Sequence, residues 1–263
     1  QIDLEMSFVD QQEVMTLTEN LVTGLFKELI EVDLGKIPVL TYGEAMTRFG
    51  SDRPDLRFDM EFVEVSDLLK EVEFKVFSGP ANAENSRVVA LRLPDGNRLT
   101  RKNIDDYTKF VSIYGARGLA YIRVNSLDEG MNGLQSPILK FLPETVVKDV
   151  LKRCRAEVGD VIFFGADKAS IVNDALGALR NRLAEDLDLY ERDWASCWVT
   201  EFPMFQIDDD GSVSAVHHPF TMPAGDLKDM EVDPLKTLSH SYDIVINGHE
   251  VGGGSIRVHD PMV

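Results

Sequence analysis

The chain has 263 residues, of which 44% are hydrophobic, and its formal net charge at pH 7 is −18. This length allows one large domain or two ordinary ones, and the acidic surplus argues against a protein that coats nucleic acid through lysine and arginine, although a local basic face could still bind a structured RNA. No apolar run approaches the roughly 18 residues of a membrane span, no signal region opens the chain, and two cysteines indicate neither a disulfide framework nor a thiolate cluster. We therefore expect a protein of the reducing cytoplasm with no membrane partner.

The N-terminal region predicts a strand followed by a helix. Residues 1–9 alternate apolar and polar side chains, which is typical of a half-buried strand, with Asp3 and Glu5 side by side on the polar face. If that face is solvated instead, the two acids carry no function. From Asp10 to Val32 the apolar residues recur every three or four positions, so we expect an amphipathic helix that Asp10 caps.

A polar connector follows the next two short elements. Residues 38–42 predict a short strand, and Thr41 is placed to cap a brief helix that ends near Phe49. Residues 50–57 are polar and rich in turn-forming types, which indicates a boundary there.

The middle region alternates short apolar strands with helices, which predicts a compact α/β or α+β module. Strands are expected at 74–77, 87–93, 119–124 and 160–164, and helices at 103–114, 144–155 and 169–187. Residues 127–135 contain two glycines and predict an exposed loop within this module.

After residue 190 the pattern favours strands again. Residues 198–205 are bulky and alternating, residues 208–211 form a turn pattern, and a second strand begins at 213–216, which together predict a hairpin. The simplest architecture is an antiparallel sheet interrupted by the inserted module.

The final run, from Asp243 to His259, is the candidate functional strand. It contains two acids, three consecutive glycines and an arginine, and glycine within a strand marks a bulge or the close approach of a ligand. Beyond the glycines, Ser255, Arg257 and His259 alternate with apolar residues, so one face is polar and the other belongs to the core. The alternative is an ordinary antiparallel strand whose polar face is solvated.

The residue types in this run are those that bind a nucleotide, a metal and an acidic small molecule. Asp243 and Glu250 flank Asn247-Gly248, and two carboxylates together with phosphate oxygens make a natural Mg²⁺ site. Arg257 offers a planar fork for a carboxylate. The glycine patterns of Walker and Rossmann sites are absent from the sequence.

His217 and His218 are adjacent, so on a strand they point to opposite faces and do not favour a shared zinc ion. One imidazole facing a carboxylate or phosphate, with the other packed beneath it, is one interpretation. A surface turn before Pro219 is the other.

Six segments, in order along the chain, resemble bacterial-type aspartyl-tRNA synthetases of class II. They are QIDLEMSF at 1–8, GSDRPDLR at 50–57, SPILKF at 136–141, FFGAD at 163–167, HHPF at 217–220 and EVGGGSIR at 250–257. The first resembles the second strand of motif 2. The resemblance implies an α+β fold in which part of the class II antiparallel sheet, with its helices, is interrupted by an inserted α/β domain named GAD after Gly165–Asp167. It divides the chain into catalytic residues 1–57, GAD residues 58–190 and a catalytic return segment, 191–263, that ends before motif 3.

The implied activity is that of an aspartate-tRNA ligase. ATP activates L-aspartate to aspartyl-adenylate, and the aspartyl group then passes to tRNA, with no side-chain nucleophile or base. By resemblance, aspartate is bound by His217, Arg257 and Asp3, with His218 and Gln1 as weaker pocket candidates. ATP is bound by Glu250 and Ser255, and Mg²⁺ by Asp243 and Glu250. The resemblance also implies a cytoplasmic homodimer for the full-length protein.

Several family parts are not matched, namely the anticodon-binding domain, motif 1, the first strand of motif 2 and motif 3. We therefore expect this chain to be a fragment that alone neither exchanges pyrophosphate with ATP nor charges tRNA. A domain of the inserted type also occurs in an archaeal tRNA-dependent amidotransferase subunit, so a non-catalytic tRNA-handling partner is the alternative; a non-catalytic synthetase paralogue is a further one. The catalytic-type segments on both sides of the insertion argue against the former, and the retained pocket residues argue against the latter. Whether the parent enzyme charges tRNA for aspartate alone or for asparagine as well is not encoded in these residues.

Overall fold

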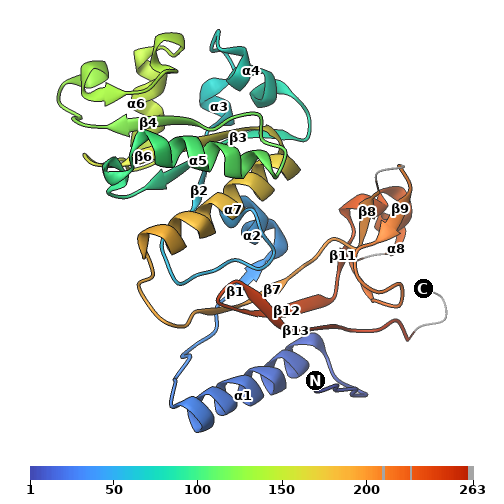
Figure 1. Ribbon diagram of the computed structural model, residues 1–263. Coiled ribbons are helices and arrows are strands. Elements are labelled where there is room, and N and C mark those ends of the chain that lie inside the picture. Colours follow the sequence, from blue (N-terminus) through green and yellow to red (C-terminus); the bar gives the residue numbers. More distant parts are fainter. Residues whose placement is uncertain (209–210, 226, 260–263) are drawn as a thin grey trace. The chain divides into compact units, whose positions relative to one another are not determined.

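The computed structural model describes residues 1–208, 211–225 and 227–259 (Figure 1). Two compact units divide the chain. The first comprises Gln1–Ala45, Asp52–Arg57 and the residues from Arg192 onward, and the second comprises Met46–Ser51 and Phe58–Glu191. The chain thus leaves the first unit and returns to it.

A four-stranded sheet with the order β1-β7-β12-β13 forms the centre of the first unit. Its strands are β1 (Val39–Thr41), β7 (Ser196–Thr200), β12 (Ser241–Ile246) and β13 (His249–Ser255). The pairs β7–β12 and β12–β13 are antiparallel, as predicted, whereas β1 runs parallel to β7. β1 precedes the second unit in the sequence and β7 follows it, and yet these two strands are hydrogen-bonded neighbours.

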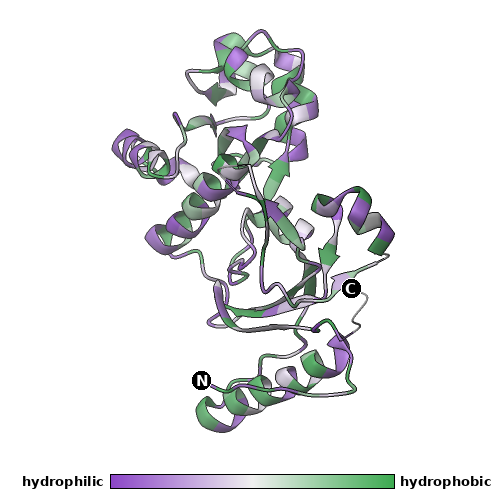
Figure 2. Cartoon of the chain, turned by 90° about the vertical axis from the view of Figure 1, so that its right-hand side faces the viewer, coloured by the Kyte–Doolittle hydropathy of each residue, from purple (hydrophilic) through white to green (hydrophobic). Residues whose placement is uncertain are grey.

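Helix α1 (Gln11–Ile30) covers one face of this sheet (Figure 1). Met15 packs with Trp198 and Ile244 in one buried cluster, and the indole of Trp198 donates a hydrogen bond of 2.9 Å to Glu19. Hydrophilic and hydrophobic residues both occur along the helix next to the N-terminus (Figure 2). The apolar spacing in the sequence thus correctly predicted an amphipathic helix.

Local capping explains where the first two helices begin. Asp10 and Glu13 form a reciprocal capping box at the start of α1. Thr41 and Glu44 make the same pair of hydrogen bonds at the start of α2 (Tyr42–Phe49). Both predicted caps are confirmed.

The remaining elements of the first unit are short. They are β8 (Phe205–Ile207), β9 (Val213–Ala215), β10 (Pro223–Ala224), α8 (Leu227–Val232), the 3₁₀ turn Pro234–Lys236 and β11 (Leu238–Ser239). β8 pairs with β9 and β10 pairs with β11, both antiparallel. The predicted hairpin exists, but β7 ends at Thr200 and the hairpin begins only at Phe205. Its predicted turn includes residues 209 and 210, which lie outside the described residues.

The second unit contains an antiparallel five-stranded sheet with the order β2-β3-β6-β4-β5. Its strands are β2 (Phe62–Glu64), β3 (Ser86–Leu93), β4 (Ala120–Val124), β5 (Leu134–Gln135) and β6 (Val161–Lys168). Its helices are α3 (Ser66–Leu69), α4 (Lys75–Asn82), α5 (Arg101–Ser112), α6 (Glu144–Arg153) and α7 (Ala169–Leu187), with 3₁₀ turns at Gly96–Arg98, Gly130–Gly133 and Leu139–Phe141.

Alternate residues of the central strands face two separate cores in this unit. Phe163 on β6 packs in a cluster with α5 and α7, whereas its neighbour Phe164 packs in a cluster with α3, α4 and α6. Helices on both faces bury the apolar runs of β3 and β6, which explains why these two strands contain such runs. The predicted α+β class, with antiparallel sheets and helices, is confirmed.

Two predicted strands are wrong. Residues 1–9 form no strand, because no described strand pairs with them, and an unpaired strand has no partner for its backbone hydrogen bonds. Residues 74–77 instead begin α4, since Phe74, Phe77 and Ala81 pack toward the core at helical spacing while Val76 is exposed. A short apolar run alone does not distinguish a strand from a helix.

Among the described residues, no helix combines the length and the apolar character needed to cross a lipid bilayer. This applies even to the longest helices, α1 with 20 residues and α7 with 19. Each of them carries charged residues along its length.

Candidate active site

The final run of the sequence is a hairpin rather than one extended strand. β12 and β13 pair antiparallel, and Asn247 and Gly248 form the two-residue turn between them, both with positive φ (52° and 79°). The Asn247 side chain anchors the turn by accepting from the Ala195 amide and donating to the Asp193 carbonyl, each at 2.9 Å. The prediction of a single strand failed because the Asn-Gly turn signal lies inside it.

A β-bulge brings the two predicted metal ligands to one face of the hairpin. Asp243 lies opposite Gly253, whereas Val245 lies opposite Glu250, so one extra residue is inserted between these pairs on β13. Directly paired residues share a face, and Glu250 and Gly253 therefore both lie on the face of Asp243. A Cβ on Gly253 would overlap Asp243 Oδ1 and lie 3.0 Å from Glu250 Oε1. Two carboxylates thus converge above Gly253, and a side chain there would displace their oxygens.

This carboxylate cluster perturbs the titration of Asp243. Burial is the main cause, and the negative charges of Glu250 and Asp52 add to it, raising the pKa of Asp243 from 3.8 to about 7. Asp52 belongs to the connector that was predicted only as a boundary. Three acids therefore contribute to one negative field.

The donor set fits a hard cation. Carboxylate oxygens are the ligands that Mg²⁺ prefers, and magnesium in proteins is usually bound by one or two carboxylates together with waters and substrate phosphates. Within residues 1–208, 211–225 and 227–259, no group of three His, Cys, Asp or Glu side chains is arranged to hold a metal on its own. The space over Gly253, with Asp243 and Glu250 beside it, therefore suits an ion whose remaining ligands come from a bound phosphate.

A basic group lies within electrostatic range of the acids. The His217 ring packs edge-on against Phe202 with centroids 4.6 Å apart. Burial is the largest influence and lowers the pKa of His217, the charges of Glu250 and Asp52 oppose it, and the charge of Arg257 adds to the lowering. The carboxylates of Glu250 and Asp52 thus favour the protonated form of this imidazole, whereas the charge of Arg257 disfavours it.

Backbone pairing beyond β13 fixes the position of Arg257. Thr221 and Arg257 form an antiparallel bridge, flanked by two backbone hydrogen bonds of 2.8 Å. This pairing links the segment after the histidines to the arginine. The arrangement joins the carboxylates of Asp243 and Glu250 to the guanidinium of Arg257, with the His217 imidazole within electrostatic range of both.

The other predicted site residues make local contacts. Ser255 shares a hydrogen bond of 3.3 Å with the Thr221 hydroxyl. His218 is exposed, and its Nδ1 accepts from the Phe220 amide at 3.3 Å, which is the surface-turn alternative for this residue.

The acidic N-terminal segment is not brought to the site. The Gln1 amide donates to Asp3 at 3.1 Å, and both residues are exposed in the segment that forms no strand. The grouping of Asp3 with Arg257 in one aspartate pocket, which the resemblance implies, depends on that strand. The structure therefore groups Arg257 with His217 and not with Asp3.

Sequence reasoning missed two residues, Asp52 and Tyr42. Asp52 contributes its charge to both Asp243 and His217. Tyr42 packs on Phe202 with ring centroids 5.4 Å apart, and burial together with the charge of Asp52 raises its pKa. The available signal was the segment GSDRPDLR, which contains Asp52, but its polar composition indicated only a connector.

The comparison with known families covers the whole chain. Residues 1–263 match the family described as tRNA synthetases class II (D, K and N). The match spans both units as well as the hairpin that carries the carboxylates. The chain therefore belongs to the class II tRNA synthetase family of the D, K and N enzymes, a family of aminoacyl-tRNA ligases.

Proposed function

We propose that the chain belongs to an aspartate-tRNA ligase. In this reaction L-aspartate and ATP form aspartyl-adenylate, and the aspartyl group then moves to tRNA. Family membership supports the ligase class, and the order of the six resembling segments supports the aspartyl branch. The observation that carries the choice of amino acid is the position of Arg257, which the bridge to Thr221 holds beside the segment that follows His217 and His218.

Arg257 favours an acidic substrate side chain over the alternatives in this family. Its guanidinium can form two parallel hydrogen bonds with a carboxylate. A lysine substrate would place an ammonium group near this positive charge, and asparagine would accept from the guanidinium through one neutral amide oxygen only, losing the ion pair and the second parallel charge-assisted hydrogen bond. Such a bond is worth roughly 1.5–3 kcal/mol, or a preference of about ten- to a hundredfold.

Asp243 and Glu250 are proposed to hold Mg²⁺ for the nucleotide. When bound, the ion neutralises charge on the ATP phosphates. The two side chains contribute by position, because the hairpin and its bulge fix both carboxylates on one face. We assign to Asp52 the attraction of the substrate ammonium group, since it adds a negative charge to the same site.

No side chain is required as a nucleophile. Adenylate formation is a displacement at phosphorus that depends on positioning and on charge neutralisation. Ser255 remains proposed for ATP, and His217, His218, Asp3 and Gln1 remain proposed for aspartate. For the last two, this requires residues 1–9 to pair with a neighbouring strand.

The remaining expectations concern the parent protein. We propose that residues 58–190 are the GAD domain, that the full-length protein is a cytoplasmic homodimer, and that tRNA is its final substrate. The second unit of the structure, Met46–Ser51 with Phe58–Glu191, supports a separate inserted body. Its strand β6 contains Gly165–Asp167.

Calorimetric titration of the 263-residue chain tests the proposal. L-Aspartate, L-asparagine and L-lysine would each be titrated in the presence of a non-hydrolysable ATP analogue and Mg²⁺. We expect aspartate to bind at least about tenfold more tightly than asparagine. Arg257→Gln should remove this preference, whereas Arg117→Gln, which changes a side chain that is 92% exposed in the second unit, should retain it. Preferential binding of lysine or asparagine would exclude the aspartate assignment.

A further inference from the structure

The second unit contains a small apolar cavity that the proposed reaction does not use. It has a volume of about 250 Å³ and lies between one face of α6 and the loop that precedes β5. Val147 and Leu151, both buried, form its α6 side, and Met131, Leu134 and the half-exposed Leu127 form its loop side. The cavity is thus an opening into the apolar core of this unit.

The loop that forms one wall is held in place by its own backbone. The amides of Asn125 and Ser126 both donate to the Gly133 carbonyl, at 2.8 and 2.9 Å. A Cβ on Gly133 would collide with the Ser126 carbonyl, so this closure requires glycine. The cavity is therefore formed before any ligand binds, which lowers the entropic cost of binding.

The charged side chains that line the cavity are all positive, and the Glu144 carboxylate lies just outside the lining, beside Gly130. Lys148, Lys152 and Arg155 belong to the lining, and no acidic residue does. Lys148 is paired with Glu144 at 2.7 Å, whereas no ion pair involves Lys152 or Arg155 in the described part of the chain. The lining itself therefore carries a positive charge. It complements an anionic ligand.

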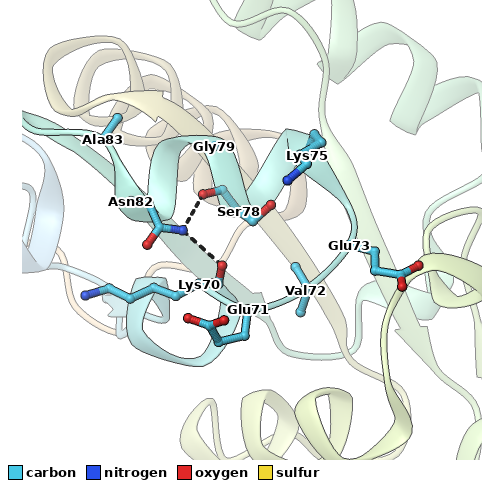
Figure 3. Close-up of a pocket in the computed structure, with 9 residues that line it drawn as sticks. All are labelled: Lys70, Glu71, Val72, Glu73, Lys75, Ser78, Gly79, Asn82 and Ala83. Carbon is cyan, nitrogen blue, oxygen red and sulfur yellow. Dashed lines mark hydrogen bonds between the residues drawn. The ribbon is translucent and has the colours of Figure 1, made fainter.

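A second, larger cavity in the same unit is lined by residues of both charges. Its volume is about 550 Å³ and it is lined by both Lys70 and Glu71 and by both Lys75 and Glu73 (Figure 3). Asn82 donates to two backbone carbonyls across it, at 2.9 and 2.8 Å. Because its lining carries both charges and the Asn82 amide is already hydrogen-bonded within the protein, this cavity does not favour one class of ligand.

We propose that the cavity beside α6 binds an acidic peptide segment of a partner protein, with one large apolar side chain seated between Leu134 and Leu151. Flanking carboxylates of that segment then pair with Lys152 and Arg155. The volume is below the roughly 300–1,000 Å³ of typical small-molecule pockets and matches a single side chain. Ser126 is the only neutral polar side chain in the lining, so the cavity offers little hydrogen bonding to a nucleobase edge. This binding is independent of the proposed aminoacylation.

Calorimetry with the 263-residue chain and the capped peptide Asp-Glu-Phe-Asp-Glu tests the proposal. We expect a dissociation constant below about 1 mM in low-salt buffer. Replacing Phe by Ser in the peptide should weaken binding at least about fivefold, because the apolar side chain fills the cavity. The double variant Lys152→Glu with Arg155→Glu should weaken it by about tenfold or more, because attraction becomes repulsion.

The control variant reverses two exposed charges on another helix of the same unit. Arg101→Glu with Lys102→Glu changes the net charge equally but does not touch the cavity, and should leave binding within about twofold. Equal losses in both double variants would overturn the proposal, as would equal binding of the Phe and Ser peptides or no binding at all. Tighter binding of a single-stranded RNA 12-mer, lost in the variant of Lys152 and Arg155, would also overturn it.

Discussion

Replacing Asp243 by asparagine should stabilise the protein at pH 8, although it removes a proposed metal ligand. The pKa of this carboxyl is about 7 in the folded chain, against an ordinary value of 3.8, because of burial and the charges of Glu250 and Asp52. The folded state therefore binds the proton more tightly than the unfolded state. Stability from this group is complete below pH ~4, declines as the pH rises toward 7, and is lost above it.

The size of the effect follows from the same pKa difference. The change from 3.8 to about 7 corresponds to roughly 4 kcal/mol at most. Asp243 is only partly buried, so water screens part of the repulsion. We expect Asp243→Asn to raise the free energy of unfolding by about 1–2 kcal/mol at pH 8 and by almost nothing at pH 4.

Urea unfolding followed by tryptophan fluorescence measures this difference. Trp194 and Trp198 are the chain's two tryptophans, and both lie in the first unit, so their emission reports on the unit that contains Asp243. The measurement is made in EDTA and repeated with about 10 mM Mg²⁺, which should stabilise the wild-type chain and not the variant. A variant that is less stable than wild type at pH 8, or equally stabilised at both pH values, would refute the reasoning.

Three further predictions concern the hairpin and the cores. Gly253→Ala should abolish stabilisation of the first unit by Mg²⁺ in thermal melts, whereas Gly252→Ala, whose Cβ would meet nothing nearer than 3.4 Å, should retain it. Arg180→Met should lower the unfolding free energy by about 3 kcal/mol in circular dichroism melts, because it leaves two buried carbonyls without their donor; an unchanged melt would contradict this. Cys154 and Cys197, whose pKa burial raises to about 12, should resist a thiol reagent at pH 8 until urea is added, and rapid native labelling would exclude this burial.

The helices were predictable because their signals are local. Asp10 and Thr41 each cap a helix through a partner three residues away, and Thr100 does the same with Asn103 at the start of α5. Such pairs are visible in the sequence and act without tertiary context. Helix α4 shows the limit, because its first residues form a run too short to decide: Phe74 and Val76 fit an alternating strand, whereas Phe74 and Phe77 fit a helix.

Strand pairing was much less predictable, since it depends on residues distant in the sequence. β1 pairs parallel with β7, so that Val39 lies opposite Trp198. In the sequence, all residues of the second unit lie between these two positions. Nothing near either residue indicates this partner. The same dependence explains why residues 1–9 have the pattern of a strand and yet form none.

The candidate site was predictable in its residue types and not in its geometry. Oxygen chemistry identified Asp243 and Glu250 from the sequence, but a regular strand would place Glu250 and Gly253 on opposite faces. The bulge, which puts them on the same face, depends on the pairing of the hairpin. Asp52 lies too far away in the sequence to have been grouped with them.

The cost of assembling these carboxylates is itself an argument for a cationic ligand. Asp243, Glu250 and Asp52 repel one another in the folded chain, and the folded chain partly relieves this by holding a proton on Asp243 near neutral pH. The glycine opposite Asp243 leaves space beside the acids that a side chain would fill. A fold optimised only for stability would place a neutral residue at this position, as Asp243→Asn tests. Retaining the repulsion is consistent with a site whose stable state includes a bound cation, because a divalent ion competes with the proton and cancels the negative field.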